Sequence, residues 1–556
     1  MDTRKTYLTV LILLAVFAVQ AFTSIWPDRK SPTADELAHH IPVGYVLIEK
    51  GDLKMDPSQP PLARYMAALP LKLFMDLNIP DERSQWRRED RSEFGKDFFY
   101  KYNDQPHRMI LYSRLIFIAA GVLCGFILFL MARSFYGERA ALLSLFLYAF
   151  SPNILAHTRL ATIDMTFSFF LLLSVYTFWL FLKNGSPGHV FSAGLCLGLA
   201  QFSKYAALLL YPIFALLVLA ELPGASRSGE RVKLILKFLA IVVISILVLW
   251  ACYGFEAAPL LKDAMRIQEK LSIARSIAGK ALPFWNEEYQ TGLADFLRKA
   301  PFPLGAHTLG ILGVMRHGFQ GHSVYFMGNW LRSGNPLYFV VAFLIKTPIP
   351  SMIFILTGFI LALMKGLRRN ERFLLITAGV IFLVASFSNL QLGIRYILPV
   401  YPLCFILAGR CADLWDGKKV YRIVGILLMA WYMVSAIWIW PNYLSYFNET
   451  IGGPDNGYKY LRDSNIDWGQ DLPALAAYMR ENDIEKVKLL YFGTASPESY
   501  GIRYDTLSER EKTEPGKDVY AISIHASSRA KWAEDNKPVA KAGYSIFIYD
   551  FREGEK

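Results

Sequence analysis

Charged residues are scarce in this sequence, and its cysteines are few and scattered. Only 19% of the 556 residues are charged, whereas soluble domains carry roughly 25%. The five cysteines form no CxxC pair and lie in or beside apolar segments, which argues against a disulfide framework and a zinc site. P-loop, GxSxG and HExxH motifs are also missing, so ATP-driven transport and hydrolysis of those types have no support.

What the sequence does contain is long apolar segments, since 54% of its residues are hydrophobic. A membrane-spanning helix needs about 17–25 mostly apolar residues. Eleven segments qualify approximately: 7–26, 109–132, 139–156, 163–183, 190–203, 204–221, 234–253, 349–364, 373–388, 394–410 and 422–440. We therefore predict a polytopic α-helical membrane protein with about eleven transmembrane helices. Nucleic acid is not an expected partner, because much of the net charge of +12 lies in short loops beside these segments.

The apolar stretch 190–220 decides the topology. It is interrupted at Gln201, Ser203 and Lys204, and dividing it there places all the basic loops on one side, as the positive-inside rule requires. We expect an inner-membrane protein whose N-terminus is cytoplasmic and whose C-terminus is periplasmic or extracellular. The first apolar segment is interpreted as an uncleaved helix rather than a signal peptide.

Three polar segments then lie on the outer side. Residues 27–108 form the first, residues 254–348 the second, with amphipathic stretches at 260–277 and 289–298, and residues 441–556 the third. The membrane domain covers residues 1–440. We predict that the tail is a small α/β domain, with a helix from Asp471 to about 482 and strands at 487–492, 519–524 and 544–549.

Asp35 and Glu36 directly follow the first predicted span and precede His39 and His40. A carboxylate at the mouth of a membrane cavity is well placed to act as a general base, and burial there would raise its pKa toward working pH. A structural alternative is equally simple, because Thr33 and Glu36 have the spacing of a helix capping box.

Two further outer segments contain ionisable groups. The stretch from Asp56 to Tyr65 includes Gln59, a Pro-Pro pair and Arg64, and is interpreted either as a turn into a helix or as the rigid edge of an active site. Asp164 begins a predicted span and follows His157 and Arg159. An ionisable residue at the end of a span indicates function, although Asp164 is also suited to cap its helix.

Lys204, Arg395 and Lys346 lie at the outer ends of predicted spans, against the positive-inside bias. Anionic lipid head groups would explain them, whereas snorkelling toward the interface is the structural alternative. The tail begins with a dense polar stretch that contains Asp467, Trp468 and Gln470. Such a stretch is typical either of a sugar-contacting surface or of a turn-rich linker.

Together these residues resemble the GT-C membrane glycosyltransferases, in particular the protein O-mannosyltransferase and aminoarabinose-transferase-like branch. The similarity rests on the Asp-Glu pair after the first span, the Pro-Pro-Leu helix start, the Asp that begins a later span, and the runs at 395–402 and 463–472. Members use a sugar linked to polyprenyl phosphate, such as undecaprenyl phosphate, and transfer it on the outer face, usually with inversion.

The resemblance implies a role for each matching residue. Asp35 would take the proton from the acceptor hydroxyl, Glu36 would orient it or contact the acceptor, and Asp164 would support the cavity. The donor phosphate would be held by Lys204, Arg395, Lys346 and Arg64. The remaining predicted substrate-binding residues are His39, His40, Gln59, His157, Arg159, Asp467, Trp468 and Gln470. Gln59 departs from the family, which has a lysine or histidine before the Pro-Pro pair.

Two other functions fit the sequence less well. A transporter or lipid flippase predicts charges within spans and paired broken helices, and a scaffold predicts a tail that only binds a partner. The acceptor of the glycosyltransferase hypothesis is a lipid, a glycan or a protein. The sequence identifies no cofactor and no metal-ligand cluster, and it leaves metal dependence open.

Overall fold

The computed structural model of the chain describes residues 3–51, 53, 55–80, 91–224, 228–259 and 301–552. These residues form two compact units. The first unit comprises residues 1–50, 63–172 and 323–556, and the second comprises residues 51–62 and 173–322. The predicted amphipathic stretches at 260–277 and 289–298 lie outside the described residues.

Helices dominate the fold. In the described part of the chain, five are long and apolar enough to cross a membrane: α1 (Thr3–Thr23), α5 (Pro106–Tyr136), α8 (Ile163–Asn184), α11 (Ser228–Cys252) and α19 (Lys419–Trp438). Two bent pairs raise the number to seven if each counts as one span. They are α6 (Glu138–Ala149) with α7 (Pro152–Thr158), and α15 (Tyr338–Lys346) with α16 (Ile349–Met364). The prediction of a polytopic helical membrane protein is confirmed.

The number of such helices is smaller than the predicted eleven because several apolar segments are interrupted. The α6–α7 pair bends by 63° just before Pro152, and the α15–α16 pair bends by 116° at Pro348. The predicted span at 394–410 consists of a 3₁₀ turn, η5 (Ile394–Ile397), followed by α18 (Val400–Ala408). Proline supplies no backbone N–H and disrupts the preceding turn, so apolar length alone overestimates helix continuity.

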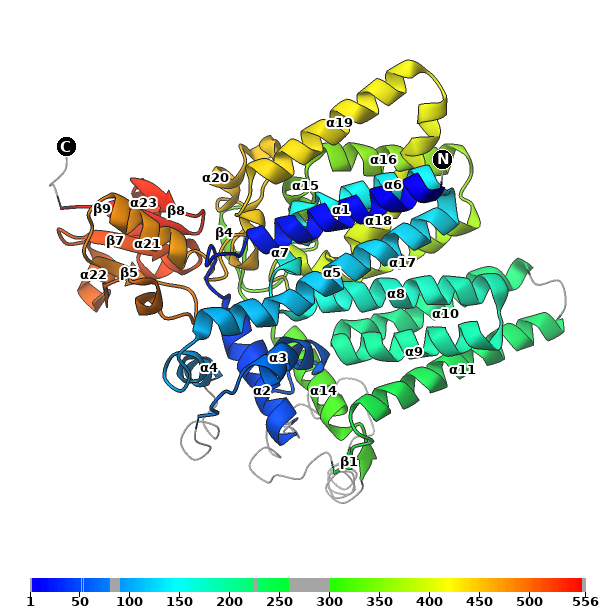
Figure 1. The fold of residues 1–556 in the computed structure, drawn as a ribbon, viewed down its shortest axis with the longest axis horizontal. Helices are drawn as coiled ribbons and strands as arrows, with labels where there is room; N and C mark the ends of the chain where they lie inside the picture. The colour runs from blue at the N-terminus through cyan, green and yellow to red at the C-terminus, as the bar shows by residue number, and fades with distance from the viewer. Residues whose placement is uncertain are drawn as a thin grey trace. The chain divides into compact units, whose positions relative to one another are not determined.

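The first unit packs α1, α5 and α6 against one another, and α18 packs on α6, α16 and α17 (Arg369–Ser386) (Figure 1). A further 3₁₀ helix, η6 (Gly409–Asp416), follows α18. Buried aromatic and aliphatic side chains fill these contacts, among them Phe17, Phe117 and Phe405.

The segment after α1 adds four short helices to the first unit: the π-helix η1 (Glu36–His40), α2 (Ile41–Lys50), α3 (Leu62–Phe74) and α4 (Arg91–Tyr100). As predicted, α3 begins directly after the Pro-Pro pair.

Two glycines allow these short helices to pack closely on one another. A Cβ on Gly44 would lie 2.1 Å from the Arg64 carbonyl oxygen, and a Cβ on Gly95 would lie 2.1 Å from the Leu37 carbonyl oxygen.

In the second unit, α9 (Pro187–Ser203) and α10 (Leu210–Glu221) both pack on α11 (Figure 1). The chain breaks between α9 and α10 at Lys204, which has an extended backbone conformation, and continues through η2 (Tyr205–Leu209). The predicted division of this apolar stretch is therefore confirmed. A short η3 (Leu222–Gly224), the strand pair β1 (Ala257–Ala258) and β2 (Phe302–Pro303), and α14 (Gly305–Gln320) complete the described part of this unit.

The tail contains the predicted small sheet. Its strand order is β6-β5-β7-β9-β8, with β5 (Val487–Leu490), β6 (Tyr504–Thr506), β7 (Val519–Ser523), β8 (Ala540–Ala542) and β9 (Ile546–Asp550). The predicted helix is α21 (Leu472–Glu481), and α22 (Glu509–Thr513) and α23 (Trp532–Asp535) follow it. A separate hairpin, β3 (Val324–Phe326) and β4 (Asn329–Leu331), precedes α15.

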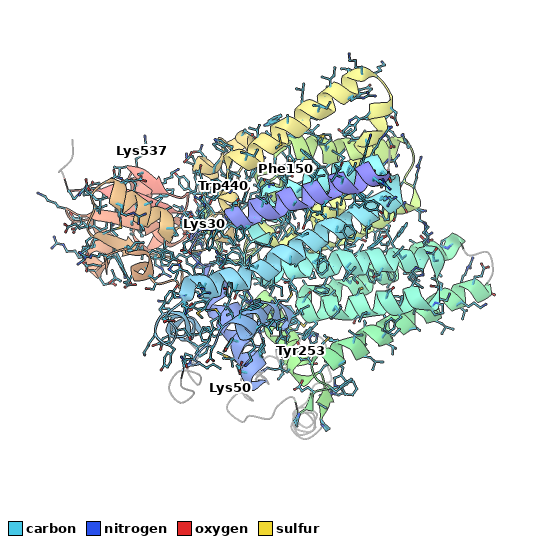
Figure 2. The ribbon with its side chains drawn as sticks, in the orientation of Figure 1. Lys30, Lys50, Phe150, Tyr253, Trp440 and Lys537 are labelled. Carbon is cyan, nitrogen blue, oxygen red and sulfur yellow. The ribbon has the colours of Figure 1, made fainter. Side chains whose placement is uncertain are left out.

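Short helical turns connect α19 to this sheet: η7 (Tyr443–Ser445), η8 (Glu449–Ile451), α20 (Pro454–Gly457) and η9 (Asp463–Asn465). Two more, η10 (Pro497–Tyr500) and η11 (Ile524–Arg529), lie between the strands. Lys30 and Trp440, labelled in Figure 2, belong to the segments that follow α1 and α19. Lys30 Nζ donates a hydrogen bond to Asn442 and forms an ion pair with Asp471, so these segments meet beside the start of α21.

Candidate active site

Three charged side chains from distant parts of the sequence meet in the first unit. Asp35 directly precedes η1, Arg395 lies in η5, and Asp164 lies in the first turn of α8. Arg395 Nη1 lies 3.1 Å from Asp35 Oδ2 and 3.8 Å from Asp164 Oδ2. The Asp164 side chain is fully buried, whereas 29% of the Asp35 side chain is exposed. Asp35 is therefore the carboxylate of this cluster that an external group can reach.

The electrostatics of Asp35 differ from the sequence-based expectation. Burial alone raises the pKa of its carboxyl, as predicted, but the Arg395 guanidinium, together with the nearby imidazoles of His39 and His40, outweighs burial. The pKa of Asp35 therefore lies below its usual value instead of rising toward working pH. Asp35 is ionised at neutral pH, and its basicity depends on where the Arg395 guanidinium lies.

A loop of the tail packs against Arg395. The Arg395 guanidinium lies 4.2 Å from the centre of the Trp468 ring. The backbone N–H of Ala34 donates to the Trp468 carbonyl at 3.0 Å, and the Thr494 hydroxyl donates to the Ala34 carbonyl at 3.1 Å. Both backbone polar groups of Ala34, the residue before Asp35, are thus held by the tail. The Trp468 side chain itself is only 2% exposed.

Glu36 lies next to Asp35 but faces the interior. Its two carboxylate oxygens accept hydrogen bonds from Arg114 Nε and Nη2, both at 2.8 Å. The Ala161 and Thr33 backbone N–H groups donate to the same carboxylate, and the Glu36 backbone N–H approaches the Thr33 hydroxyl as in a capping box. These contacts support the structural alternative for Glu36, whose predicted role on the acceptor stays a prediction.

Asp467 and Gln470 are buried within the same tail loop. The oxygens of Asp467 accept the backbone N–H groups of Gly469 and His525, and Gln470 bonds to the backbone of Ile466 and Trp468. Burial raises the pKa of the Asp467 carboxyl to about 8. These contacts favour the interpretation of this stretch as a structural linker.

The other predicted cations of the first unit are also buried. Lys346 Nζ donates to the carbonyls of Leu444 and Asn465 and lies 4.2 Å from the Phe447 ring centre. Arg159 donates to the Ser24 and Pro441 carbonyls. Arg64 donates to the His39 carbonyl at 3.0 Å and so supports the helix that follows Asp35.

The remaining predicted residues divide between the two units. His39 and His40 lie in η1, close enough to Asp35 to lower the pKa of its carboxyl. His157 is fully buried, with its ring 6.3 Å from that of Trp468. Lys204 and Gln59 belong to the second unit, where Lys204 is largely buried at the end of α9.

Sequence reasoning missed two buried pairs that support the site. Arg114 lies near the start of the apolar helix α5 and pairs with Glu36, and Lys30 pairs with Asp471. A charged residue within a span is itself a signal for a partner, so Arg114 was detectable. Over the described ranges, no group of three His, Cys, Asp or Glu side chains is arranged to hold a metal ion.

The sequence model of the dolichyl-phosphate-mannose-protein mannosyltransferase family matches residues 109–250 of this chain. The match confirms the resemblance to this glycosyltransferase group. It also confirms the prediction that the chain is an enzyme of the glycosyltransferase class. The matched part includes Asp164 and Lys204 but neither Asp35 nor Arg395.

Three solved structures are similar in outline. ArnT from Cupriavidus metallidurans, bound to undecaprenyl phosphate, is 13% identical, with 99% of this chain and 98% of that chain covered and a TM-score of 0.48. The oligosaccharyltransferase AglB from Archaeoglobus fulgidus, in complex with an inhibitory peptide and a dolichol-phosphate, is 15% identical. The match covers 87% of this chain and 59% of that chain, with a TM-score of 0.47. The Pmt1-Pmt2 complex from S. cerevisiae, bound to the sugar donor, is 19% identical. The match covers 46% of this chain and 34% of that chain, with a TM-score of 0.36. A search of curated proteins found no match.

Proposed function

We propose that this membrane glycosyltransferase moves a sugar from a polyprenyl-phosphate-linked donor to an acceptor hydroxyl, with Asp35 as general base. The observation that carries the proposal is the contact of Arg395 with both Asp35 and Asp164. An accessible carboxylate beside a buried guanidinium pairs a proton acceptor with a cation suited to phosphate. The family match and the ArnT complex with undecaprenyl phosphate support a donor of this class.

The proposed reaction is a single displacement. Asp35 takes the proton of the acceptor hydroxyl while the acceptor oxygen forms a bond to the anomeric carbon of the donor sugar. The bond between that carbon and the phosphate oxygen breaks, and its electron pair leaves with the polyprenyl phosphate. Attack from the side opposite the phosphate inverts the configuration, as the family resemblance implies.

Arg395 would couple donor binding to the basicity of Asp35. A phosphate group that binds the guanidinium competes with Asp35 for its positive charge. When the guanidinium turns toward phosphate, the charge that lowers the pKa of Asp35 is partly neutralised, and burial then raises that pKa. Asp35 becomes a better base once the donor is bound. Lys346 and Arg64 remain proposed contributors to the phosphate site.

We place the reaction at the outer face of the inner membrane. The basic loops beside the spans favour a cytoplasmic N-terminus and an external tail. In this arrangement residues 1–440 are the catalytic membrane domain and residues 441–556 the outer domain. Lipid, glycan and protein acceptors all present hydroxyls that Asp35 would activate.

Replacing Asp35 tests the proposal directly. Asp35→Asn keeps the size of the side chain but removes the base, so we expect sugar transfer to fall by about 10²–10⁴-fold. Asp28→Asn is the matched control, since Asp28 lies in the same segment with a 59% exposed side chain. Mass spectrometry of envelope glycolipids and glycoproteins, from cells lacking the gene and complemented with each variant, measures the transfer. Full activity of Asp35→Asn, in protein that inserts normally, would falsify the role of Asp35.

A transporter or flippase is the alternative. The two bent helix pairs favour it, because broken helices line the substrate sites of many transporters. Reconstituted vesicles separate the two functions: lipid or solute movement without release of polyprenyl phosphate would support transport, and release of polyprenyl phosphate would support glycosyl transfer.

A further inference from the structure

A tryptophan outside the proposed catalytic cluster is partly exposed on a well-supported hairpin. Trp330 in β4 is 39% exposed and lies opposite Tyr325 of β3, with the two ring centres 5.3 Å apart. Its ring centre is also 5.7 Å from that of His525 in η11. We propose that Trp330, His525 and Asp463 form a saccharide subsite that holds the sugar acceptor, a proposal that rests on the function proposed above.

The hairpin is held firmly against the tail. The Arg462 guanidinium lies 3.9 Å from the Tyr325 ring centre and donates to the Tyr325 hydroxyl. Arg462 also pairs with Glu534 at 2.8 Å, and the Met327 backbone N–H donates to the Tyr460 carbonyl at 2.8 Å. A ring held in this way loses little freedom when a ligand stacks on it, which favours binding.

Polar groups beside the indole suit a sugar hydroxyl. The Asp463 backbone N–H donates to His525 Nδ1 at 3.2 Å, which places the proton of a neutral imidazole on Nε2. His525 Nε2 then faces Asp463 Oδ2 at 3.9 Å, a separation too long for a direct hydrogen bond. A hydroxyl is the group that accepts from one of these atoms and donates to the other.

The combination favours a saccharide over a peptide. A pyranose ring has an apolar face of C–H groups, which stacks on an indole, and a rim of hydroxyls, which bonds to imidazole and carboxylate. Phe492 extends the aromatic surface, since its ring centre lies 4.2 Å from that of His525. The sequence suggested sugar stacking on Trp468, but that indole is buried against Arg395, whereas the indole of Trp330 is accessible.

The proposed subsite shares neighbouring residues with Asp35. The Asp463 carboxylate, like those of Asp35 and Asp164, lies near enough to Arg395 to interact with its charge. On the other side, Thr494, two residues after Phe492, donates to the carbonyl of Ala34. A sugar bound at Trp330 therefore lies on the same group of tail residues that holds Asp35 in place.

Saccharide binding to the full-length protein in detergent tests the proposal. The probes are methyl glycosides of glucose, galactose, mannose and N-acetylglucosamine, detected by saturation-transfer NMR. We expect Trp330→Ala to weaken binding of at least one probe about tenfold, and Trp330→Phe to restore part of it. Trp431→Ala is the matched control, because Trp431 has the same exposure of about 40% but lies on α19. Equal binding of the glycosides by wild type and Trp330→Ala would overturn the proposal. It would also be overturned if the wild-type protein bound an unglycosylated Ser/Thr peptide but none of the glycosides.

The outcomes separate this proposal from the general function. If the subsite is right, Asp35→Asn still binds the glycoside although transfer is lost. If Trp330→Ala transfers sugar at the wild-type rate while Asp35→Asn does not, the subsite is wrong and the proposed function stands. If the glycoside binds through Trp330 but polyprenyl phosphate is never released, Trp330 is a saccharide site but not an acceptor site, and the proposed function is wrong.

Discussion

Arg395 contacts two carboxylates, and this arrangement determines how Asp35 titrates. Asp35 is partly exposed, so substrate and solvent reach it, while Asp164 holds the guanidinium from the buried side. An arginine stays protonated at all physiological pH values. The pKa of Asp35 therefore depends on where the Arg395 guanidinium lies, and not on whether Arg395 is protonated.

Arg395→Gln is predicted to shift the acid limb of the pH–rate profile upward. Wild-type Asp35 has a lowered pKa, so its ionised form persists to a pH below the usual range of an aspartate. Without the guanidinium, burial dominates and raises that pKa, so the base is lost at a higher pH. The variant should also bind the donor at least tenfold more weakly, since a charge-assisted contact to phosphate is removed.

The measurement is kcat/KM for transfer from about pH 3 to about pH 9, a range that extends below the usual pKa of an aspartate, together with binding of undecaprenyl phosphate. Arg395→Lys is the informative comparison, because it keeps the charge but loses the planar guanidinium. It should show a smaller shift of the acid limb than Arg395→Gln. An acid limb at the same pH in all three proteins would contradict the coupling of Arg395 to Asp35.

At the scale of elements, the position of Asp35 depends on how closely α4 packs on η1. Gly95 in α4 faces the Leu37 carbonyl, where a Cβ would lie at 2.1 Å from the oxygen. Real Cβ atoms do not approach a backbone oxygen so closely, so any larger residue must displace one of the two helices. Because η1 begins directly after Asp35, such a displacement reaches the proposed base.

Gly95→Ala is therefore predicted to lower both thermal stability and transfer. We expect the cost of overpacking to be about 1–3 kcal/mol. Gly229→Ala is the matched control, because Gly229 lies in the first turn of α11 with no atom within 4 Å of an added Cβ. There the alanine should be neutral or slightly stabilising. Thermal unfolding in detergent and the transfer assay measure both effects. Equal behaviour of the two variants would rule out the tight packing of α4 on η1.

At the scale of the first unit, a buried ion pair joins the segment after α1 to the tail. The side chains of Lys30 and Asp471 are 3% and 0% exposed. Asp471 also accepts hydrogen bonds from Ser545 and the Tyr544 backbone. The tail, through Trp468 and Thr494, in turn holds the backbone N–H and carbonyl of Ala34, directly before Asp35.

Lys30→Met should destabilise the protein by about 3–5 kcal/mol, because it leaves the Asp471 carboxylate buried without its cation. The double variant Lys30→Met/Asp471→Leu should recover part of this loss, since the unpaired charge is removed. Arg133→Met provides the contrast: its partner Glu138 lies at 3.1 Å, but the Arg133 side chain is 34% exposed, and such pairs contribute about 0–1 kcal/mol. Thermal unfolding of all three variants is the measurement. A double variant no more stable than Lys30→Met would contradict this account.

The sequence predicted local features of the fold well. The break at Lys204, the start of α3 after the Pro-Pro pair and the helix α21 all follow signals carried by neighbouring residues. The strands β5, β7 and β9 were predicted, but β6 and β8 were not. Those two strands contain three residues each and form the edges of the sheet, so they are too short for an alternating pattern to show.

Partners of the candidate site residues were less predictable. Arg395 and Asp35 are 360 residues apart, and Lys346 reaches carbonyls in the tail. Lys346 and Trp468 both have residue types suited to ligand binding, yet both side chains are buried against other parts of this chain. Residue type and spacing indicate which groups need a partner, but not whether that partner is a ligand or another segment.

The sequence by itself determined that this chain is a polytopic helical membrane protein, with polar segments between its spans and a small α/β tail. Apolar length and charge asymmetry suffice for this, because they act through the local cost of placing residues in lipid or water. Only the tertiary structure decided that Arg395 joins Asp35 to Asp164, that Glu36 faces inward and that Trp468 is buried while Trp330 stays accessible. Those outcomes depend on which distant segments pack together, because a buried charge takes its partner from whichever segment lies beside it.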